Sequence, residues 1–470
     1  MNPSGCSKED TSSKLLQSSG KTDASIFEYA PDTRLGCDFV PPEDDVTVPG
    51  SLLNYEGKQR TDADDNAFDR GGYGWVVCVA CFAGQFMFPL GLSYGLFNVV
   101  LLEQFGGTKM ETALVGSVCY GLMQGMGVVS GTLANRLGHR MTCMIGSLLT
   151  TSGYIISAFS PNLGLLYFSY GVMTGTGVSM MTFTTSIMVN FYFKKYRNLA
   201  VGIMTSGAGV GYLVFPLMIE HFIETYSWRG AMVLLAGISF QGCVVGALLR
   251  PNERLKTFRA RTEQPKTTLH LRLFRKWTFI LLIFILFTYG ISASIFFTIC
   301  PHRVVTYGFS IEQGALLLFL TGIASLAARL FIGVVFQFFK YNTSIALGTA
   351  ITGMAVAHLV LAFHHNQLWV LILVSVGFGL MFGLLAYSYT LCVVTFFGLE
   401  RLNSAFGFIV TGNGLGGLLG PSLAGFLYDS TGDYQVAFSV ASALAFIGGL
   451  LNIPMYFYMR RKLTHKIVID

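Results

Sequence analysis

One arginine, Arg329, lies inside a long apolar stretch of the sequence, and the nearest acidic residue before it is Glu312. A charged side chain at the centre of a membrane helix costs at least about 2.5–3.5 kcal/mol, so it is expected to face a cavity or a partner. The planar guanidinium suits bidentate capture of a carboxylate. Because no Asp or Glu lies comparably deep, we expect a negatively charged solute to be the partner. The alternative is a guanidinium held by backbone carbonyls between helices.

The composition indicates the elements that must position Arg329. The chain has 470 residues, 52% hydrophobic and 12% charged, whereas soluble domains carry about 25% charged residues. An apolar run of about 20 residues can cross a membrane, and backbone groups in lipid pair internally only in helices or closed barrels. The sequence predicts twelve spanning helices, at residues 75–102, 112–134, 141–160, 163–190, 199–219, 229–249, 278–300, 313–338, 343–363, 367–393, 404–427 and 434–458.

The distribution of charge predicts how these helices are oriented. Every second loop is basic, with Arg136 and Arg140 in one and Lys194, Lys195 and Arg197 in the next. Because basic loops stay in the cytoplasm, both termini are expected there, which requires an even number of spans. Topology therefore explains the net charge of +6, and no nucleic-acid partner is expected.

Composition also divides the chain into parts. Residues 1–70 contain 14 acidic and 7 basic residues, and such a segment lacks the apolar surface needed to fold alone. The expected organisation is a disordered cytoplasmic tail at 1–70, a six-helix half at 71–250, a basic cytoplasmic linker at 251–277, a second six-helix half at 278–458 and a cytoplasmic tail at 459–470. The linker is expected to lie against anionic headgroups of the bilayer.

A spaced set of small residues occurs twice. Gly202, Gly207, Gly209, Gly211 and Pro216 recur, each 205 positions later, as Gly407, Gly412, Gly414, Gly416 and Pro421. Internal repeats of this kind are typical of solute carriers, whose binding site lies between the halves. Glycines let helices approach closely and proline permits bending. The repeat favours a moving interface, and ordinary close packing is the alternative.

Three motifs carry a family resemblance. Residues 131–140, Gly-Thr-Leu-Ala-Asn-Arg-Leu-Gly-His-Arg, resemble the loop motif of the major facilitator superfamily, with Asn135 where many members have Asp. Residues 70–75 and 192–211 resemble motifs of the monocarboxylate transporter family. The motif residues expected to govern anchoring and conformational change are Gly71, Gly72, Gly74, Trp75, Arg136, Lys194, Lys195, Arg197, Gly202, Gly207, Gly211, Pro216, Gly412 and Pro421.

The resemblance implies an all-α membrane protein of the major facilitator fold, with two pseudo-symmetric halves. It also implies roles for four positions. Arg329 matches the substrate-binding arginine of proton-coupled members, whose Asp and Lys are replaced here by Ser325 and Ser93, and Phe382 matches a ring that gauges substrate size. Because serine does not titrate usefully, tight proton coupling is expected to be lost or moved. A single-span glycoprotein chaperone is a partner by analogy only.

Further polar groups complete the predicted site. Tyr94, Tyr387 and Asn413 are expected to line the solute path, although buried Tyr and Asn side chains commonly only pair with neighbouring helices. His358 is the nearest titratable alternative for proton coupling, and a structural role is the favoured interpretation. Cys78 and Cys81 have CxxC spacing inside an apolar helix, which disfavours a redox or metal role.

The sequence therefore predicts a secondary transporter in the plasma membrane that moves a small organic solute by alternating access. A monocarboxylate is the favoured solute, and proton coupling is in doubt. Two alternatives stay open: a facilitative carrier of a neutral or zwitterionic solute such as an aromatic amino acid, thyroid hormone or creatine, and a sensor or scaffold without flux. Neither a P-loop nor an HExxH sequence is present, so no enzyme activity, cofactor or metal is expected.

Overall fold

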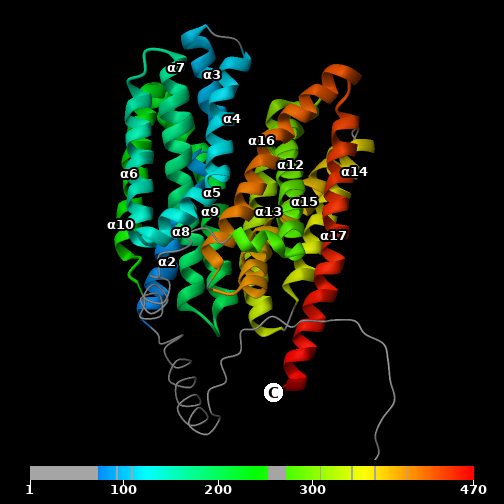
Figure 1. Cartoon of the computed structure of the whole chain (residues 1–470). Helices are drawn as coiled ribbons and strands as arrows, with labels where there is room; N and C mark the ends of the chain where they lie inside the picture. The colour runs from blue at the N-terminus through cyan, green and yellow to red at the C-terminus, as the bar shows by residue number, and fades with distance from the viewer. Residues whose placement is uncertain are drawn as a thin grey trace, which may run out of the picture. The chain divides into compact units, whose positions relative to one another are not determined.

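The computed structural model describes residues 72–91, 94–106, 109–251, 271–306, 308–339, 342–364, 367–399 and 401–469. All of them belong to one compact unit, Gln59–Asp470. Within that unit the described residues form a helical bundle (Figure 1). The predicted tail at 1–70 and most of the predicted linker at 251–277 lie outside the described residues, as do Gly71 and Ser93.

The first half contains the elements that follow Gly72. Their order is α2 (Tyr73–Phe86), the 3₁₀ turn η1 (Phe88–Gly91), α3 (Tyr94–Phe105), α4 (Lys109–Gly125), α5 (Gly127–Arg136), α6 (His139–Ala158), α7 (Leu163–Leu166), the π-helix η2 (Tyr167–Thr174), α8 (Gly175–Tyr192), α9 (Arg197–Phe240) and α10 (Gly242–Leu248).

The second half is built from longer, less interrupted helices. After the 3₁₀ turn η3 (Leu271–Arg275) come α12 (Trp277–Thr306), α13 (Ile311–Phe338), α14 (Thr343–Phe363), α15 (Leu368–Phe397), α16 (Leu402–Thr431) and α17 (Tyr434–Ile469). The last predicted span ended at 458 and was followed by a tail. The stretch Tyr434–Tyr458 is long and apolar enough to cross a membrane, as predicted, and the helix continues past it to Ile469.

Each of the twelve predicted spans corresponds to helix in the described residues. By length and composition alone, nine of the described helices could cross a membrane, or ten if the bent pair α4 and α5 forms one span. One of the nine, at 197–248, covers two predicted spans, which meet at a kink at Ser227. The helix α16 covers the predicted span at 404–427.

Two spans are less regular than the sequence suggested. The first predicted helix, 75–102, is broken at η1, where Pro89 stands; proline lacks the N–H needed to continue a helical ladder. The kink at Ser227 has φ 63° and ψ 171°, a combination that costs a residue with a side chain about 1–3 kcal/mol. These breaks turn the chain within or between spans, which apolar periodicity does not reveal.

The repeated glycines explain how α9 and α16 pack. On one face, a Cβ on Gly207 or Gly211 would meet the backbone of α2, and one on Gly412 or Gly416 would meet α12. On another face each helix approaches the opposite half: a Cβ on Gly202 would lie 2.9 Å from the Cα of Gly333 in α13. The close approach predicted from the repeat is therefore present in both halves, and it includes the surface between them.

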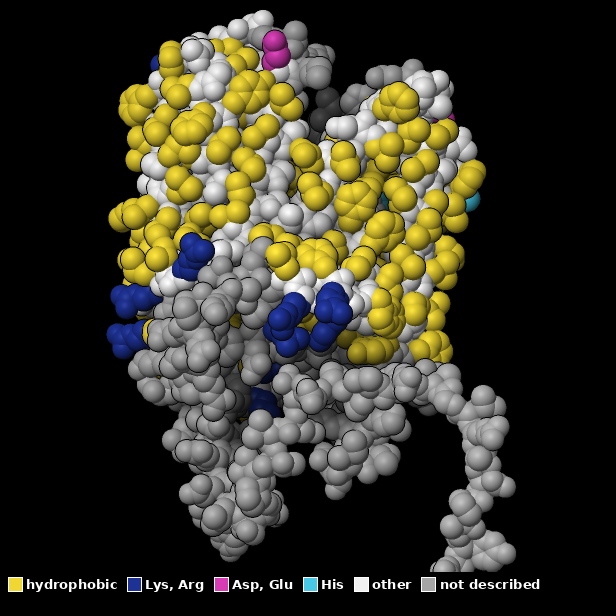
Figure 2. All heavy atoms as spheres, viewed as in Figure 1, with side chains coloured by type: hydrophobic (Ala, Val, Ile, Leu, Met, Phe, Trp, Pro, Cys, Tyr) yellow, Lys and Arg dark blue, Asp and Glu magenta, His cyan; other side chains and the backbone are white. Residues whose placement is uncertain are grey.

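The two halves meet mainly toward the end of the bundle that carries the basic side chains. There the Asn198 side chain donates to the Phe336 carbonyl at 2.7 Å, and Gln337 donates to the Lys195 carbonyl at 2.9 Å. Figure 2 shows Lys and Arg side chains gathered at this lower end, hydrophobic side chains over the flanks, and the two halves parted at the upper end. We call this lower end, where Lys195, Asn198, Phe336 and Gln337 lie, the basic end.

Candidate functional site

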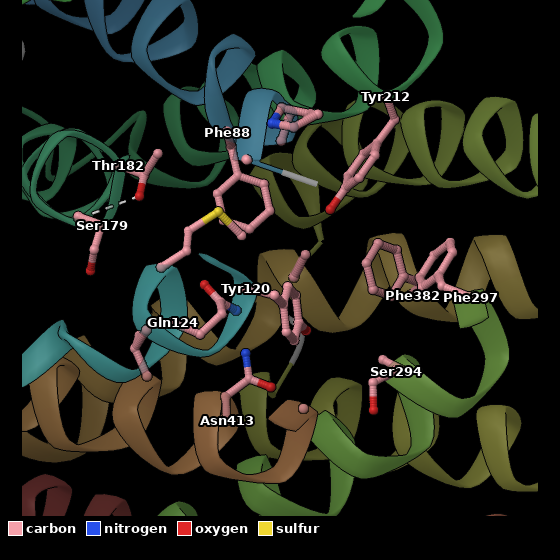
Figure 3. Close-up of a pocket in the computed structure, with 18 of the residues that line it drawn as sticks. Phe88, Tyr120, Gln124, Ser179, Thr182, Tyr212, Ser294, Phe297, Phe382 and Asn413 are labelled. Atoms are coloured by element: carbon pink, nitrogen blue, oxygen red, sulfur yellow. Dashed lines mark hydrogen bonds between the residues drawn. The ribbon is translucent and has the colours of Figure 1, made fainter. Parts of the chain in front are cut away.

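A cavity of about 560 Å³ lies between the two halves and is lined by both. Aromatic side chains form part of its wall, among them Tyr120 and Tyr212 from the first half and Tyr289, Phe297 and Phe382 from the second. Hydroxyl and amide groups supply the rest of the polar surface: Gln85, Asn98, Ser117, Gln124, Ser179, Thr182, Ser186, Thr205, Ser294, Thr298 and Asn413. Figure 3 shows 18 of the lining residues around this space, ten of them labelled.

Arg329 is the one charged side chain among the described residues that line the cavity. It is 3% exposed, and its Nη1 donates to the Thr205 carbonyl at 2.8 Å, across the boundary between the halves. Its Nε has no hydrogen-bond partner among the described residues. The guanidinium carbon lies 5.6 Å from the centre of the Phe382 ring. The Thr205 carbonyl thus accepts from only one of the nitrogens of a guanidinium that has five N–H donors.

Several residues predicted from the sequence are brought together here. Arg329, Phe382, Asn413 and Tyr94 line the same cavity. Tyr94 contributes its ring, since its hydroxyl already donates to the Thr112 carbonyl at 2.7 Å. The helix-bending prolines Pro216 and Pro421 also line the cavity, one from each half.

The structure does not place Ser325 and Tyr387 in the cavity lining. Ser325 is one turn before Arg329, but α15 covers it: a Cβ on Gly383 would lie 2.5 Å from the Ser325 carbonyl oxygen. Tyr387 is fully buried and packs against Phe336, with ring centres 5.5 Å apart. Its neighbours Ala386 and Tyr389 line the cavity instead, because successive residues of a helix point about 100° apart.

Sequence reasoning missed most of the aromatic wall. Tyr212 and Pro216 are one turn apart on α9, and both line the cavity. The spacing of Tyr212 from the predicted proline was a usable signal. Tyr120 also had a signal, because Ser117 and Gln124 share its face of α4 and line the cavity with it. Tyr289, Phe297 and Tyr389 gave none, because α12 and α15 are apolar on every side.

His358 lies away from the cavity, inside the second half. It is fully buried, with Nδ1 2.8 Å from the Met354 carbonyl oxygen and Nε2 3.1 Å from the Ser292 carbonyl oxygen. Phe296, Phe378 and Phe438 pack around its ring. These contacts support the structural interpretation of this histidine.

Several of the family-motif residues gather at the basic end. The Trp75 ring lies 5.0 Å from that of Phe193, and Tyr73 donates to the Leu248 carbonyl at 2.7 Å. Arg197 donates from Nε to the Phe193 carbonyl at 3.0 Å, at the end of α8. Arg136, Lys194 and Lys195 are exposed there. These motif residues therefore join the ends of helices, whereas Pro216 and Pro421 of the same set line the cavity.

A chain of three polar side chains links the halves at the same end. The Asn403 amide nitrogen donates to Asn135 Oδ1 at 2.6 Å, and Asn403 Oδ1 lies 3.1 Å from His139 Nε2. Because the amide nitrogen is the donor toward Asn135, Oδ1 accepts from the histidine. Asn135 and His139 belong to the first half and Asn403 to the second. We call these three residues the amide latch.

Comparison with known proteins gives a consistent result. The family described as Major Facilitator Superfamily matches residues 77–397 and 340–468. Human "Monocarboxylate transporter 11" is 30% identical over 400 residues, covering 82% of this chain and 83% of the relative. "Monocarboxylate transporter 4" of Gallus gallus is 26% identical over 432 residues, covering 88% of each.

Solved structures share the fold. The human organic anion transporter MFSD10 (TETRAN) superposes with a TM-score of 0.63 at 16% identity, covering 81% of this chain and all of the other. The proton:xylose symporter XylE, bound to 6-bromo-6-deoxy-D-glucose, gives a TM-score of 0.66 at 15% identity, covering 80% of this chain and 94% of the other. At these identities the likeness concerns the fold alone.

Proposed function

We propose that this chain, which belongs to the monocarboxylate transporter family within the major facilitator superfamily, carries a monocarboxylate across the plasma membrane by alternating access. Membership of the family makes it a membrane transporter of a small solute and not an enzyme. The monocarboxylate, the plasma membrane and the cytoplasmic placement of both termini are part of the proposal. The basic end supports that orientation, because positively charged loops stay in the cytoplasm.

The observation that carries the proposal is the unbalanced charge of Arg329. The described cavity lining contains no acidic side chain to pair with it, and its Nε is buried without a partner there. A buried unsatisfied donor costs about 1–3 kcal/mol, more for a charged group. A carboxylate would accept hydrogen bonds from the free edge of the guanidinium and neutralise its charge.

The test is uptake of labelled lactate and pyruvate into proteoliposomes. Arg329→Gln removes the charge, and Arg329→Lys keeps the charge but loses the planar fork. Removing a hydrogen bond to a charged group costs about 1.5–3 kcal/mol, or roughly 12- to 140-fold. We expect Arg329→Gln to lose at least about tenfold in uptake and Arg329→Lys to retain part of it. Arg272→Gln, at an exposed arginine of η3, is the matched control. Unchanged uptake in Arg329→Gln contradicts the proposal, and binding without flux indicates a sensor.

We further propose that this flux does not depend on a proton gradient. The described cavity lining contains no His, Asp or Glu, and His358 is held inside the second half. Ser325, where proton-coupled relatives carry Asp by resemblance, cannot take up a proton at useful pH. Uptake should therefore change little when an inward proton gradient is imposed. Several-fold acceleration by that gradient would reject this part of the proposal, and loss of the acceleration in His358→Gln would assign the coupling to that histidine.

One observation favours a second candidate, a zwitterionic solute. The side-chain oxygens of Asn98 and Asn413 are buried and have no hydrogen-bond partner among the described residues, and both side chains line the cavity. Free acceptors of this kind suit the N–H groups of an ammonium. Competition between an amino acid and the corresponding 2-oxo acid decides between the two. Asn413→Leu should weaken binding of the amino acid, and not of the 2-oxo acid, if the ammonium is bound there.

A further inference from the structure

Three neighbouring aromatic rings stand together in the wall of the cavity. Tyr212 of α9 and Phe297 of α12 have nearly parallel rings, 5° apart in plane with centres 6.4 Å apart. Phe382 of α15 stands across both, at 67° to Tyr212 and 71° to Phe297, with centre distances of 6.5 and 5.2 Å. Figure 3 shows Phe297 and Phe382 beside each other, with Tyr212 above them. We call these three residues the aromatic box.

The aromatic box differs from the aromatic packing of the core directly behind it. Phe296 and Phe378 stack at 3.7 Å with an interplanar angle of 8°, and both are fully buried. That spacing is face-to-face contact. The ring centres of Tyr212 and Phe297 are 6.4 Å apart, which is 2.7 Å more than the 3.7 Å between Phe296 and Phe378. Tyr212 and Phe297 both line the cavity. Tyr212 and Phe297 are therefore not in face-to-face contact with each other.

The aromatic box adjoins the guanidinium. The Arg329 carbon Cζ lies 5.6 Å from the centre of the Phe382 ring, so Phe382 contacts both the charge and the two parallel rings. A carboxylate on the free edge of Arg329 would direct a substituent of a few atoms toward the aromatic box. The cavity volume of about 560 Å³ is within the range of pockets that hold drug-sized ligands. A three-carbon acid would leave much of it unused.

We propose that the aromatic box is a subsite for a planar aromatic substituent, so that the solute is an aryl-substituted monocarboxylate. This inference rests on the proposed function, because Arg329 must bind the carboxylate end. Aromatic rings prefer edge-to-face or offset contacts with other rings, beyond the burial of their area. A ring that lies in the cavity against the aromatic box can meet these three rings in either geometry. Since Tyr212 belongs to the first half and the other two rings to the second, a bound ring would also bridge the halves.

The test compares acids with the same charge and chain length: 3-phenylpropionate, 3-cyclohexylpropionate and propionate. A specific ring contact is worth a factor of about 2 to 12 in affinity beyond burial. We expect 3-phenylpropionate to compete for binding and uptake about 2- to 12-fold better than 3-cyclohexylpropionate, although cyclohexyl is at least as apolar. Phe297→Leu should bring that ratio close to one, and Phe297→Tyr should keep the preference.

The matched control is Phe284→Leu, the same substitution on the same helix at a residue that is 42% exposed. It should keep the phenyl preference. Equal competition by the phenyl and cyclohexyl acids, or a ratio unchanged in Phe297→Leu, overturns the inference while leaving carboxylate transport intact. Ring-selective binding to the purified protein, measured by thermal shift, without uptake would reject transport and leave the subsite in place. Failure of all three acids to bind would reject both.

Discussion

Replacing Asn403 with Ala should weaken closure of the basic end. This side chain lies at the centre of the amide latch, is 7% exposed, and hydrogen-bonds to both Asn135 and His139 in the other half. Each such bond contributes about 0.5–1.5 kcal/mol net. Both must break when the halves separate at this end, so the variant loses about 1–3 kcal/mol of closure. The ratio of the form open at the basic end to the closed form should therefore rise about 5- to 140-fold.

The assay is the distance between two spin labels at the basic end, one on each half. Leu137, which follows α5, is 47% exposed, and Phe339, which follows α13, is 68% exposed, so both can carry labels without entering the core. Double electron–electron resonance in nanodiscs, in a background depleted of reactive cysteines, gives the share of each conformer. We expect a second, longer distance to gain population in Asn403→Ala.

The matched control is Asn452→Ala in α17. Asn452 is 3% exposed and makes two hydrogen bonds to Ser344 in α14, so both bonds stay within one half. Its loss should lower thermal stability without changing the distance distribution. The reasoning fails if Asn403→Ala leaves the distribution unchanged, or if Asn452→Ala shifts it equally.

Two further predictions concern backbone geometry. Gly202→Leu should weaken closure of the basic end by about 1–3 kcal/mol through overpacking, because its Cβ would lie 2.9 Å from Gly333 Cα. The same pair of spin labels should report this opening. Gly237→Leu in α9 should leave the distance distribution unchanged, because a Cβ there meets nothing within 4 Å. Ser227→Gly should raise the thermal midpoint by relieving about 1–3 kcal/mol of strain at φ 63°; an unchanged or lower midpoint would contradict the strain.

The spacing of small residues predicted much of the helix packing. The repeat at Gly202 and Gly407 predicted close helix contacts in both halves, and the structure has them because only glycine lets two helix backbones approach so nearly. The bends were harder to predict. Ser227 adopts a glycine-like conformation that its side chain disfavours, and tertiary packing imposes it against local preference.

The candidate site was only partly predictable for a related reason. Arg329 stood out because a lone charge in an apolar helix is costly. The aromatic residues around it did not stand out, because rings also face lipid, as Phe284 and Phe331 do at 42% and 70% exposed. Tyr387 was selected where Tyr389 lines the cavity, since the rotation of a helix that is apolar all round cannot be read from its sequence.

The position of Arg329 suggests how binding and reorientation are connected. Its guanidinium belongs to the second half and donates to the Thr205 carbonyl of the first half, so this hydrogen bond is one of the contacts that hold the halves together around the cavity. A carboxylate that draws the guanidinium to itself would compete with that carbonyl. The solute would then remove the hydrogen bond from Arg329 to Thr205 and accept hydrogen bonds from the guanidinium itself. A ring in the aromatic box would add contacts to both halves. A ligand shifts a conformational equilibrium only by its differential affinity for the two states. On the proposed function, Arg329 and the aromatic box are the groups through which such a difference would arise.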